Sequence, residues 1–301
     1  MASLYSHKEK NIRRTWALFT GFLVVLVGFG WLMSSLYENP VILVVAAVFS
    51  IVMSVVGYFG SDRIVLALAH ARPVTAETAP ELHRIVENLA ITAGLPMPRI
   101  YIIPERAPNA FATGRDPHHA VVAVTEGLLQ KLDRSELEGV LAHELSHIGN
   151  RDMLVGTVAV ILVGFISILG DMFLRSALWG GGRGRNGGQG GAGPVLFLIG
   201  VGASILAPLS AVLIQLAISR RREFLADASG AFLTRYPEGL AQALEKIAAD
   251  ATPLRAANNT TAHLWLTDPF KAKQRGSFLH KLFMTHPPIE ERIKALKGLK
   301  I

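Results

Sequence analysis

Cysteine is absent from this chain of 301 residues. Disulfide bonds and thiolate ligands are therefore excluded, and any transition-metal site must rely on nitrogen and oxygen donors. Charged residues are also scarce, at 18% of the chain, whereas hydrophobic residues make up 50%. This balance is too apolar for a typical soluble enzyme, and it indicates segments that lie in a membrane.

Four blocks with almost no charge hold the excess of apolar residues. They are residues 15–37, 40–60, 154–174 and 194–218. Each block is long enough for a helix to cross the hydrocarbon core of a bilayer, although Asp171 lies in the third and Pro208 in the fourth. A cleaved signal peptide is the alternative for the first block, but its apolar run is too long and a second run follows at once. We therefore expect four transmembrane helices.

Basic residues predict the orientation of these helices. The amino-terminal arm carries four basic residues and the turn at 37–40 carries none, so the amino terminus is expected in the cytoplasm. Three arginines in the opposite loop conflict mildly with this rule. The expected organisation is two transmembrane helices (15–60), a first cytoplasmic part (61–153), a transmembrane hairpin with a glycine-rich external loop at 176–193 (154–218), and a second cytoplasmic part (219–301).

The net charge of +7 raises the question of a nucleic-acid partner. Many basic residues flank the apolar blocks, and the sequence holds no recognisable nucleic-acid motif. Anionic lipid is therefore the expected partner of these charges, and nucleic acid is not.

The first cytoplasmic part has a helical pattern followed by β-like runs. Leu82, Ile85, Leu89 and Ile91 are expected on one face of a helix that Gly94 ends. Three short runs, at 99–104, 109–114 and 120–125, then predict a small sheet. The second cytoplasmic part reads as helices, so the fold class is α+β and mainly α.

The stretch 139–153, GVLAHELSHIGNRDM, carries the predicted chemistry. A capping box from Ser135 to Glu138 predicts a helix through position 147. Residues four apart on a helix lie above one another, so His143 and His147 can offer ring nitrogens to one ion. Glu144 lies beside them, where it can activate water without binding the ion. This H-E-x-x-H arrangement is typical of zinc peptidases, and two unrelated surface histidines are the alternative.

A third ligand is needed, because a catalytic zinc usually has three protein ligands and one open position. The segment SRRREFLADASGAF offers Glu223 as that ligand, and Asp227 as the acceptor of a hydrogen bond from a ligating imidazole. In the alternative, Glu223 only pairs with Arg220 or Arg222 on a helical face. Beside the histidine pair the ligand role is favoured, and one Zn²⁺ per chain is expected.

Four stretches together resemble a known family. VLAHELSHIGNRD, SRRREFLADASGA, NAFATG and THPPIEERI are similar to segments of the membrane-embedded HtpX heat-shock proteases, which are related to the CAAX prenyl endopeptidases. The resemblance covers nearly the whole chain. It implies a zincin-like cytoplasmic domain, zinc held by His143, His147 and Glu223, and Glu144 as general base. It also implies cleavage of misfolded or membrane proteins at the bacterial inner membrane.

Further roles follow from the same resemblance. The run Asn109, Ala110 and Phe111 resembles the substrate-binding edge strand of thermolysin-like peptidases, with a plain core strand as the alternative. His286 is a candidate donor to the oxyanion, although it can equally begin the last helix. Arg220 either anchors the ligand helix or contacts the polarised carbonyl.

Two other functions remain open at this point. One is a processing protease with a single lipidated or membrane substrate. The other is a metal-stabilised scaffold without catalysis, against which Glu144 speaks because a structural site needs no base. The oligomeric state and any lid, for which 251–280 has the composition, are not predicted by the pattern.

Overall fold

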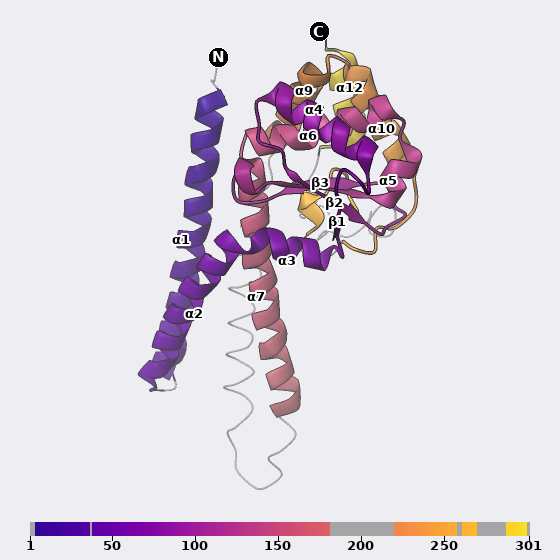
Figure 1. Ribbon diagram of the computed structural model, residues 1–301. Coiled ribbons are helices and arrows are strands. Elements are labelled where there is room, and N and C mark those ends of the chain that lie inside the picture. The colour runs from indigo at the N-terminus through magenta and orange to yellow at the C-terminus, as the bar shows by residue number, and fades with distance from the viewer. Residues whose placement is uncertain (1–3, 37, 181–219, 258–260, 270–286, 300–301) are drawn as a thin grey trace.

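The computed structural model describes residues 4–36, 38–180, 220–257, 261–269 and 287–299. Three long helices stand beside a domain of shorter helices and a small sheet (Figure 1). These helices are α1 (Leu4–Leu36), α2 (Pro40–Phe59) and α7 (Asp152–Gly180). The start of α1 and the end of the last described helix, at Lys297, lie at the domain end of the molecule, and the α1–α2 turn lies at the far end of these two helices (Figure 1).

Two helices of the described residues are long and apolar enough to cross a bilayer, at Asn11–Ser35 and Pro40–Phe59. A third is added if the bent pair of α6 (Arg134–Gly149) and α7 is taken as one span. The first two predicted spans therefore have their counterparts in α1 and α2. The predicted third span corresponds to α7, whereas the predicted fourth span, 194–218, and the predicted glycine-rich loop at 176–193, beyond Gly180, lie outside the described residues.

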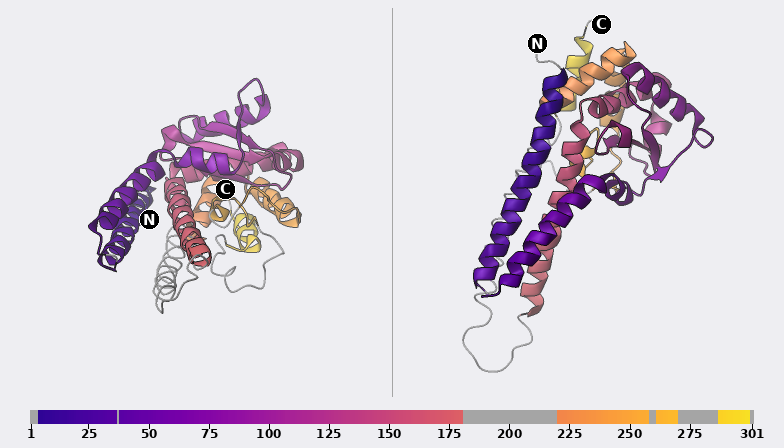
Figure 2. Two further views of the ribbon diagram at one scale, coloured as in Figure 1. Left: turned by 90° about the horizontal axis from the view of Figure 1, so that it is seen from below. Right: turned by 60° about the vertical axis from the view of Figure 1, so that its left-hand side comes forward.

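The long helices pack through one shared apolar cluster. Leu18 and Phe22 of α1 are fully buried against Leu162 of α7, and Met53 of α2 joins them. The outward face of α2 is apolar as well, with exposed valines such as Val48. Side chains of this kind suit contact with lipid. Figure 2 shows α1 and α2 running together with α7 alongside.

The sheet has four strands in the order β1-β2-β4-β3. They are β1 (Arg72–Pro73), β2 (Arg99–Ile103), β3 (Ala110–Thr113) and β4 (Val121–Thr125). The β2–β4 pair is parallel, and the β1–β2 and β3–β4 pairs are antiparallel. The sheet is therefore mixed, and β3 forms one of its edges. The three predicted β-like runs are confirmed, while β1 was not predicted.

Helices cover the sheet on both faces. Their bounds are α3 (Ser61–Leu68), α4 (Pro80–Ala93), α5 (Glu126–Lys131), α9 (Arg220–Thr234), α10 (Pro237–Ala249) and α12 (Ile289–Lys297), with short 3₁₀ turns η1 (Pro117–His119) and η2 (Ala262–Leu264). Alternate residues of β4 face opposite cores, as the pleat requires. Val122 and Val124 pack with α4, α6 and α10, while Val121 and Ala123 pack with α3 and Trp265.

The helix α4 ends as predicted, at a glycine. Gly94 has φ +64°, a left-handed conformation that glycine adopts without strain. Leu82, Ile85 and Leu89 are buried as expected. The expectation for Ile91 was wrong, because its side chain is 71% exposed. Ile91 lies one position off the buried row, since its neighbour Ala90 fills the core instead.

The helix α6 starts earlier than predicted. Its capping box joins Asp133 and Glu136, each of whose side chains accepts a backbone N–H of the other. The predicted box of Ser135 and Glu138 was wrong: Ser135 already lies in the first turn, and its hydroxyl donates to Asp133. The sequence DRSELE contains both registers of the pattern, and the structure uses the first.

The motif helix α6 ends at Gly149, before the next apolar block, which lies in α7. Between α6 and α7 the chain bends by 82° at a break. Arg151 in this break has φ +56°, which stops the helical ladder. The bend leaves α6 packed across the domain and directs α7 away from it (Figure 1).

Candidate metal site

The helix α6 presents the two histidines of the motif on one face. The Nε2 atoms of His143 and His147 lie 3.1 Å apart, and the two rings are nearly perpendicular, at 87°. His143 is buried and His147 is half-buried. The four-residue spacing thus brings both imidazoles to one point, as a helix requires.

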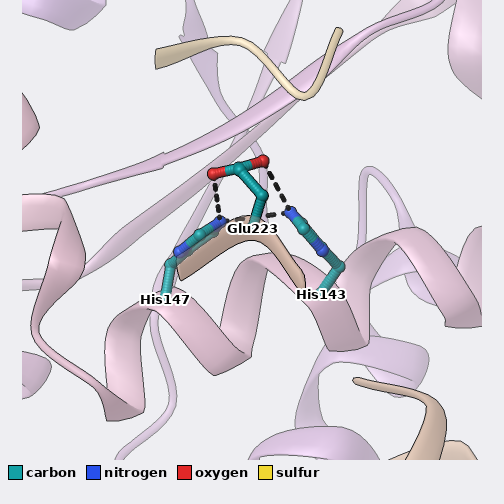
Figure 3. Close-up of side chains that lie close together, drawn as sticks. All are labelled: His143, His147 and Glu223. Atoms are coloured by element: carbon teal, nitrogen blue, oxygen red, sulfur yellow. Dashed lines mark hydrogen bonds and ion pairs between the residues drawn. The ribbon is translucent and has the colours of Figure 1, made fainter. Parts of the chain in front are cut away.

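A carboxylate from a distant helix completes the cluster. Glu223 of α9 places Oε2 3.9 Å from His143 Nε2 and Oε1 3.6 Å from His147 Nε2. Figure 3 shows the three side chains converging on a common space. One ligand atom from each residue lies within 4.8 Å of the others, the spacing of a metal site.

Close packing of α9 on α6 makes this convergence possible. A Cβ atom at Gly230 would lie 2.9 Å from the backbone nitrogen of His143. Real Cβ atoms do not approach backbone so closely, so only glycine fits at this crossing. The absent side chain therefore lets Glu223 reach the histidines.

The hydrogen bonds around the imidazoles test whether a metal fits. His143 Nδ1 lies 2.9 Å from Asp227 Oδ1, and His147 Nδ1 lies 3.2 Å from Asp152 Oδ2. Carboxylates accept hydrogen bonds, so each Nδ1 carries the hydrogen, and the Nε2 of a neutral ring then points its lone pair into the space between the rings. When both rings are neutral, two facing lone pairs and the Glu223 carboxylate repel one another unless a cation lies between them. The donor set therefore fits a divalent transition metal.

A buried arginine holds Asp227 in place. Arg292 of α12 has no solvent exposure, and its Nε and Nη2 donate to the two oxygens of Asp227 at 2.8 and 2.6 Å. Its Nη1 lies 3.7 Å from Glu223 Oε2. Burial opposes ionisation of Asp227, yet Arg292 and His143 lower the pKa of its carboxyl to about 2. Asp227 is thus an anion between Arg292 and His143.

The two histidines differ in their affinity for protons. Burial lowers the pKa of His143 to about 4. Burial also acts to lower the pKa of His147, but the hydrogen bond that His147 donates to Asp152 and the charge of Glu223 prevail and raise the pKa to about 9. In the metal-free protein at neutral pH, the His143 ring is therefore neutral, whereas the His147 ring is protonated on both nitrogens and carries a positive charge.

Glu144 lies beside the cluster and is 2% exposed. Burial is the main cause that raises the pKa of its carboxyl to about 7, while a hydrogen bond from the backbone of Ala112 partly opposes that rise. The contact with Ala112 ties Glu144 to the edge strand β3. A carboxyl with this pKa can accept and release a proton near neutrality.

The predicted substrate edge lies on β3 and is already paired at one point. The N–H of Leu266 donates to the carbonyl of Ala110 at 2.9 Å. The Asn109 amide donates to the carbonyl of Thr267 at 3.1 Å and accepts from its N–H at 3.3 Å. Phe111 is buried edge-to-face against Trp265. Residues 265–267, which belong to the segment 251–280 with the composition of a lid, therefore pack along this edge.

The remaining predicted site residues are not in the cluster. Arg220 begins α9 and is exposed. His286 lies outside the described residues. Sequence reasoning missed Arg292, Asp152 and Arg222, whose Nε lies 3.5 Å from Asp152 Oδ1. Asp152 lies within the quoted stretch 139–153, five residues after His147, so its position was a usable signal.

Comparison with protein families gives a match over most of the chain. Residues 76–300 match the model of peptidase family M48. The matched range contains every residue of the cluster.

Similar proteins extend over the whole chain. A protease HtpX homolog of Thermoanaerobacter pseudethanolicus is 46% identical over 299 residues, which cover 99% of this chain and 98% of that protein. A protease HtpX homolog of Pyrococcus furiosus is 48% identical over 288 residues, which cover 95% of each. Among solved structures, the crystal structure of S. mikatae Ste24p has a similar fold, with a TM-score of 0.51 at 19% identity, over 98% of this chain and 67% of that one.

Proposed function

This chain belongs to the HtpX proteases of peptidase family M48 and is a membrane metalloprotease; on that premise we propose that its metal is zinc, held by His143, His147 and Glu223. One observation carries the proposal. Two lone-pair-bearing imidazole nitrogens and a carboxylate converge beside a second, buried carboxylate, that of Glu144. Two histidines and a glutamate form one of the usual ligand sets of catalytic zinc.

Glu144 is the proposed general base. When bound, zinc would act as a Lewis acid: it would lower the pKa of a water molecule from about 16 toward about 7 and polarise the scissile carbonyl. Glu144 takes the proton of the attacking water and delivers it to the leaving amine. Asp227 and Asp152 keep His143 and His147 in the tautomer that presents Nε2. No covalent intermediate is needed.

An extended peptide is the proposed substrate form, and it binds along β3 at Asn109, Ala110 and Phe111. An edge strand offers backbone groups to a peptide, and β3 also contacts Glu144 through Ala112. Since the carbonyl of Ala110 accepts from Leu266, a substrate that pairs at this carbonyl must replace that bond.

Two further roles rest on the resemblance of the sequence alone. His286, which precedes the described Pro287, donates to the oxyanion. Arg220 anchors the start of the ligand helix. Alanine at either position is expected to lower kcat with metal content unchanged.

The proposed topology has four transmembrane helices with the amino terminus and the active site in the cytoplasm. The apolar blocks and the basic amino-terminal arm support it, and so does the position of the domain at the same end as the amino terminus (Figure 1). The membrane is proposed to be the bacterial inner membrane. Membrane and misfolded proteins are the proposed substrates, in quality control.

A dedicated processing protease is the alternative within the same chemistry. Mass spectrometry of the peptides released from total membrane protein distinguishes the two. Many cleavage sites in many proteins support quality control, whereas a single cut in a single protein supports dedicated processing.

Replacing Glu144 tests the mechanism. Glu144→Gln keeps the shape of the side chain but not its basicity, so casein cleavage in detergent is expected to fall by about 10²- to 10⁴-fold with zinc content unchanged. Glu138→Gln, on the same helix and paired only at the surface with Arg134, is the matched control. Cleavage by Glu144→Gln at the wild-type rate contradicts this mechanism.

A further inference from the structure

Asn11 is a buried polar residue at the start of the first membrane helix. It is 4% exposed, and its side chain enters the turn between α6 and α7. Its Nδ2 donates to the carbonyl of Asn150 at 3.1 Å and to Asp152 Oδ1 at 2.6 Å. Its Oδ1 accepts from Arg222 Nη1 at 3.3 Å. Both kinds of hydrogen-bonding atom of the amide are thus used inside the protein.

Two partners of Asn11, Asp152 and Arg222, each lie next to a ligand of the proposed metal. Asp152 bonds Asn11 with one carboxylate oxygen and faces His147 Nδ1 with the other, at 3.2 Å. Arg222 directly precedes Glu223 on α9. Asn11 therefore connects α1 with the two segments that carry His147 and Glu223, and each connection passes through one intervening group.

The turn that Asn11 contacts is conformationally demanding. It contains Arg151 at φ +56° and joins two helices bent by 82°. A residue other than glycine in this left-handed region is held there by its surroundings. The hydrogen bond from Asn11 to the carbonyl of Asn150 helps to stabilise this conformation. A second hydrogen bond from Asn11 positions Asp152, the first residue of α7.

We infer that Asn11 is a positioning residue for the metal ligand His147, acting through Asp152. An amide suits the position because it donates to two acceptors and accepts from a guanidinium at once. An apolar side chain leaves Asp152 and Asn150 without that donor, and an aspartate places a second carboxylate against Asp152. The inference rests on the proposed metal centre, and it makes α1 part of the support of that centre.

The test compares two substitutions on the same helix. Asn11→Leu removes the amide and keeps its size. Thr15→Val removes a hydroxyl that is 2% exposed and donates only to the carbonyl of Asn11 in its own helix. Asn11→Leu is expected to raise the dissociation constant for zinc about tenfold, the scale of changes behind a metal ligand. It is also expected to shift the visible absorption of the cobalt(II)-substituted protein and to lower kcat at unchanged KM. Thr15→Val is expected to change none of these.

Two further variants allow the inference to be tested even if Asn11→Leu does not fold or the metal centre is wrong. Asn11→Asp preserves shape and the acceptor toward Arg222, so it carries the same test if Asn11→Leu does not fold. The inference is overturned if a folded Asn11 variant keeps the zinc affinity and cobalt spectrum of the wild type. His147→Ala separates the two ideas: if it binds zinc as tightly as the wild type, the metal centre itself is wrong, whatever Asn11 does.

Discussion

Arg292 places a fully buried positive charge beside the site. Its charge is fully buried and meets the carboxylates of Asp227 and Glu223. Removing water from a charge costs several kcal/mol, so such a group is stable only when paired and hydrogen-bonded. Arg292 also donates to the carbonyl of Leu266 at 3.0 Å, which ties the charge pair to the segment along β3.

Loss of this arginine is expected to be costly. Arg292→Met leaves Asp227 buried without its main partner, and we expect a loss of about 3–5 kcal/mol in the free energy of unfolding. Lys297→Met, on the same helix, breaks only the exposed pair with Glu245 and is expected to lose under about 1 kcal/mol. Urea unfolding of the metal-free proteins in detergent measures both. Equal losses for the two variants would show that the buried pair does not stabilise the fold.

Metal binding is expected to depend on pH through His147. Zinc needs the neutral imidazole, whereas the Asp152 and Glu223 carboxylates outweigh burial and raise the pKa of His147 to about 9 in the metal-free protein. Zinc must therefore displace a proton below pH 9, and its apparent affinity is expected to rise roughly tenfold per pH unit from 6 to 8. His143, whose pKa is lowered to about 4, adds no dependence in this range.

A chelator competition at pH 6, 7 and 8 measures this slope. Asp152→Asn removes one cause of the raised pKa of His147, so its affinity is expected to level off at a lower pH. If the zinc affinity of the wild type does not change over this range, His147 is not protonated in the metal-free protein and the prediction is wrong.

The sequence predicted the residues of the site that share a helix more readily than those that meet across helices. The spacing of His143 and His147 places them together on any helix, and Glu223 followed from the need for a third ligand. Arg292 gave no such signal, because an arginine in EERIKALK looks like part of a solvated helical face. Its burial depends on how α12 packs against α9, which no local pattern records.

Among the elements, the crossing of α6 and α9 decides the ligand distances. Gly230 lies at the point of contact, with its hypothetical Cβ 2.9 Å from the backbone of His143. The two helices can approach this closely only without a side chain there. Glu223 lies on the same helix as Gly230, so a shift of α9 moves the third ligand.

A methyl group at this crossing is expected to separate the ligands. Gly230→Ala forces backbone apart, an overpacking that typically costs about 1–3 kcal/mol, and zinc affinity should fall as Glu223 recedes. Gly164→Ala is the control, because no atom lies within 4 Å of the added Cβ. Zinc titration and unfolding of both variants test this, and undiminished affinity in Gly230→Ala would mean that the crossing tolerates the methyl group.

Helices were predicted correctly where the pattern of apolar residues extends over several turns. The helix α4 and its glycine end followed from apolar spacing, and α10 and α12 agree with the helices expected in residues 219–301. The start of α6 was misplaced because two registers of one capping pattern overlap in DRSELE. The bend after Gly149 was not predicted: glycine and asparagine are common at helix ends, but the angle between the two helices depends on tertiary contacts such as that of Asn11.

At the scale of the whole molecule, the domain lies at the end where α1, the first of the three long helices, begins (Figure 1). The sequence predicted the membrane helices from composition alone, since long uncharged blocks have few alternatives. It did not predict that α7 packs against α1 and α2, because that arrangement follows from side-chain fit in the cluster around Leu162.

The absence of cysteine permits a direct test of the proposed topology. A single cysteine at Glu38, in the exposed α1–α2 turn, is expected to react with a membrane-impermeant maleimide on intact cells. A single cysteine at Asn88, exposed on α4, is expected to react only after the membrane is opened. The two labels are measured by mass shift, and the reverse pattern would invert the orientation.

The bend between α6 and α7 has a mechanical consequence. With α7 as the proposed third span, its tilt adjusts to the thickness of the surrounding bilayer, as membrane helices do. The first residue of α7 is Asp152, the carboxylate that steadies His147. The length of the lipid acyl chains is therefore expected to affect the orientation of His147, a proposed zinc ligand, and with it the rate of hydrolysis.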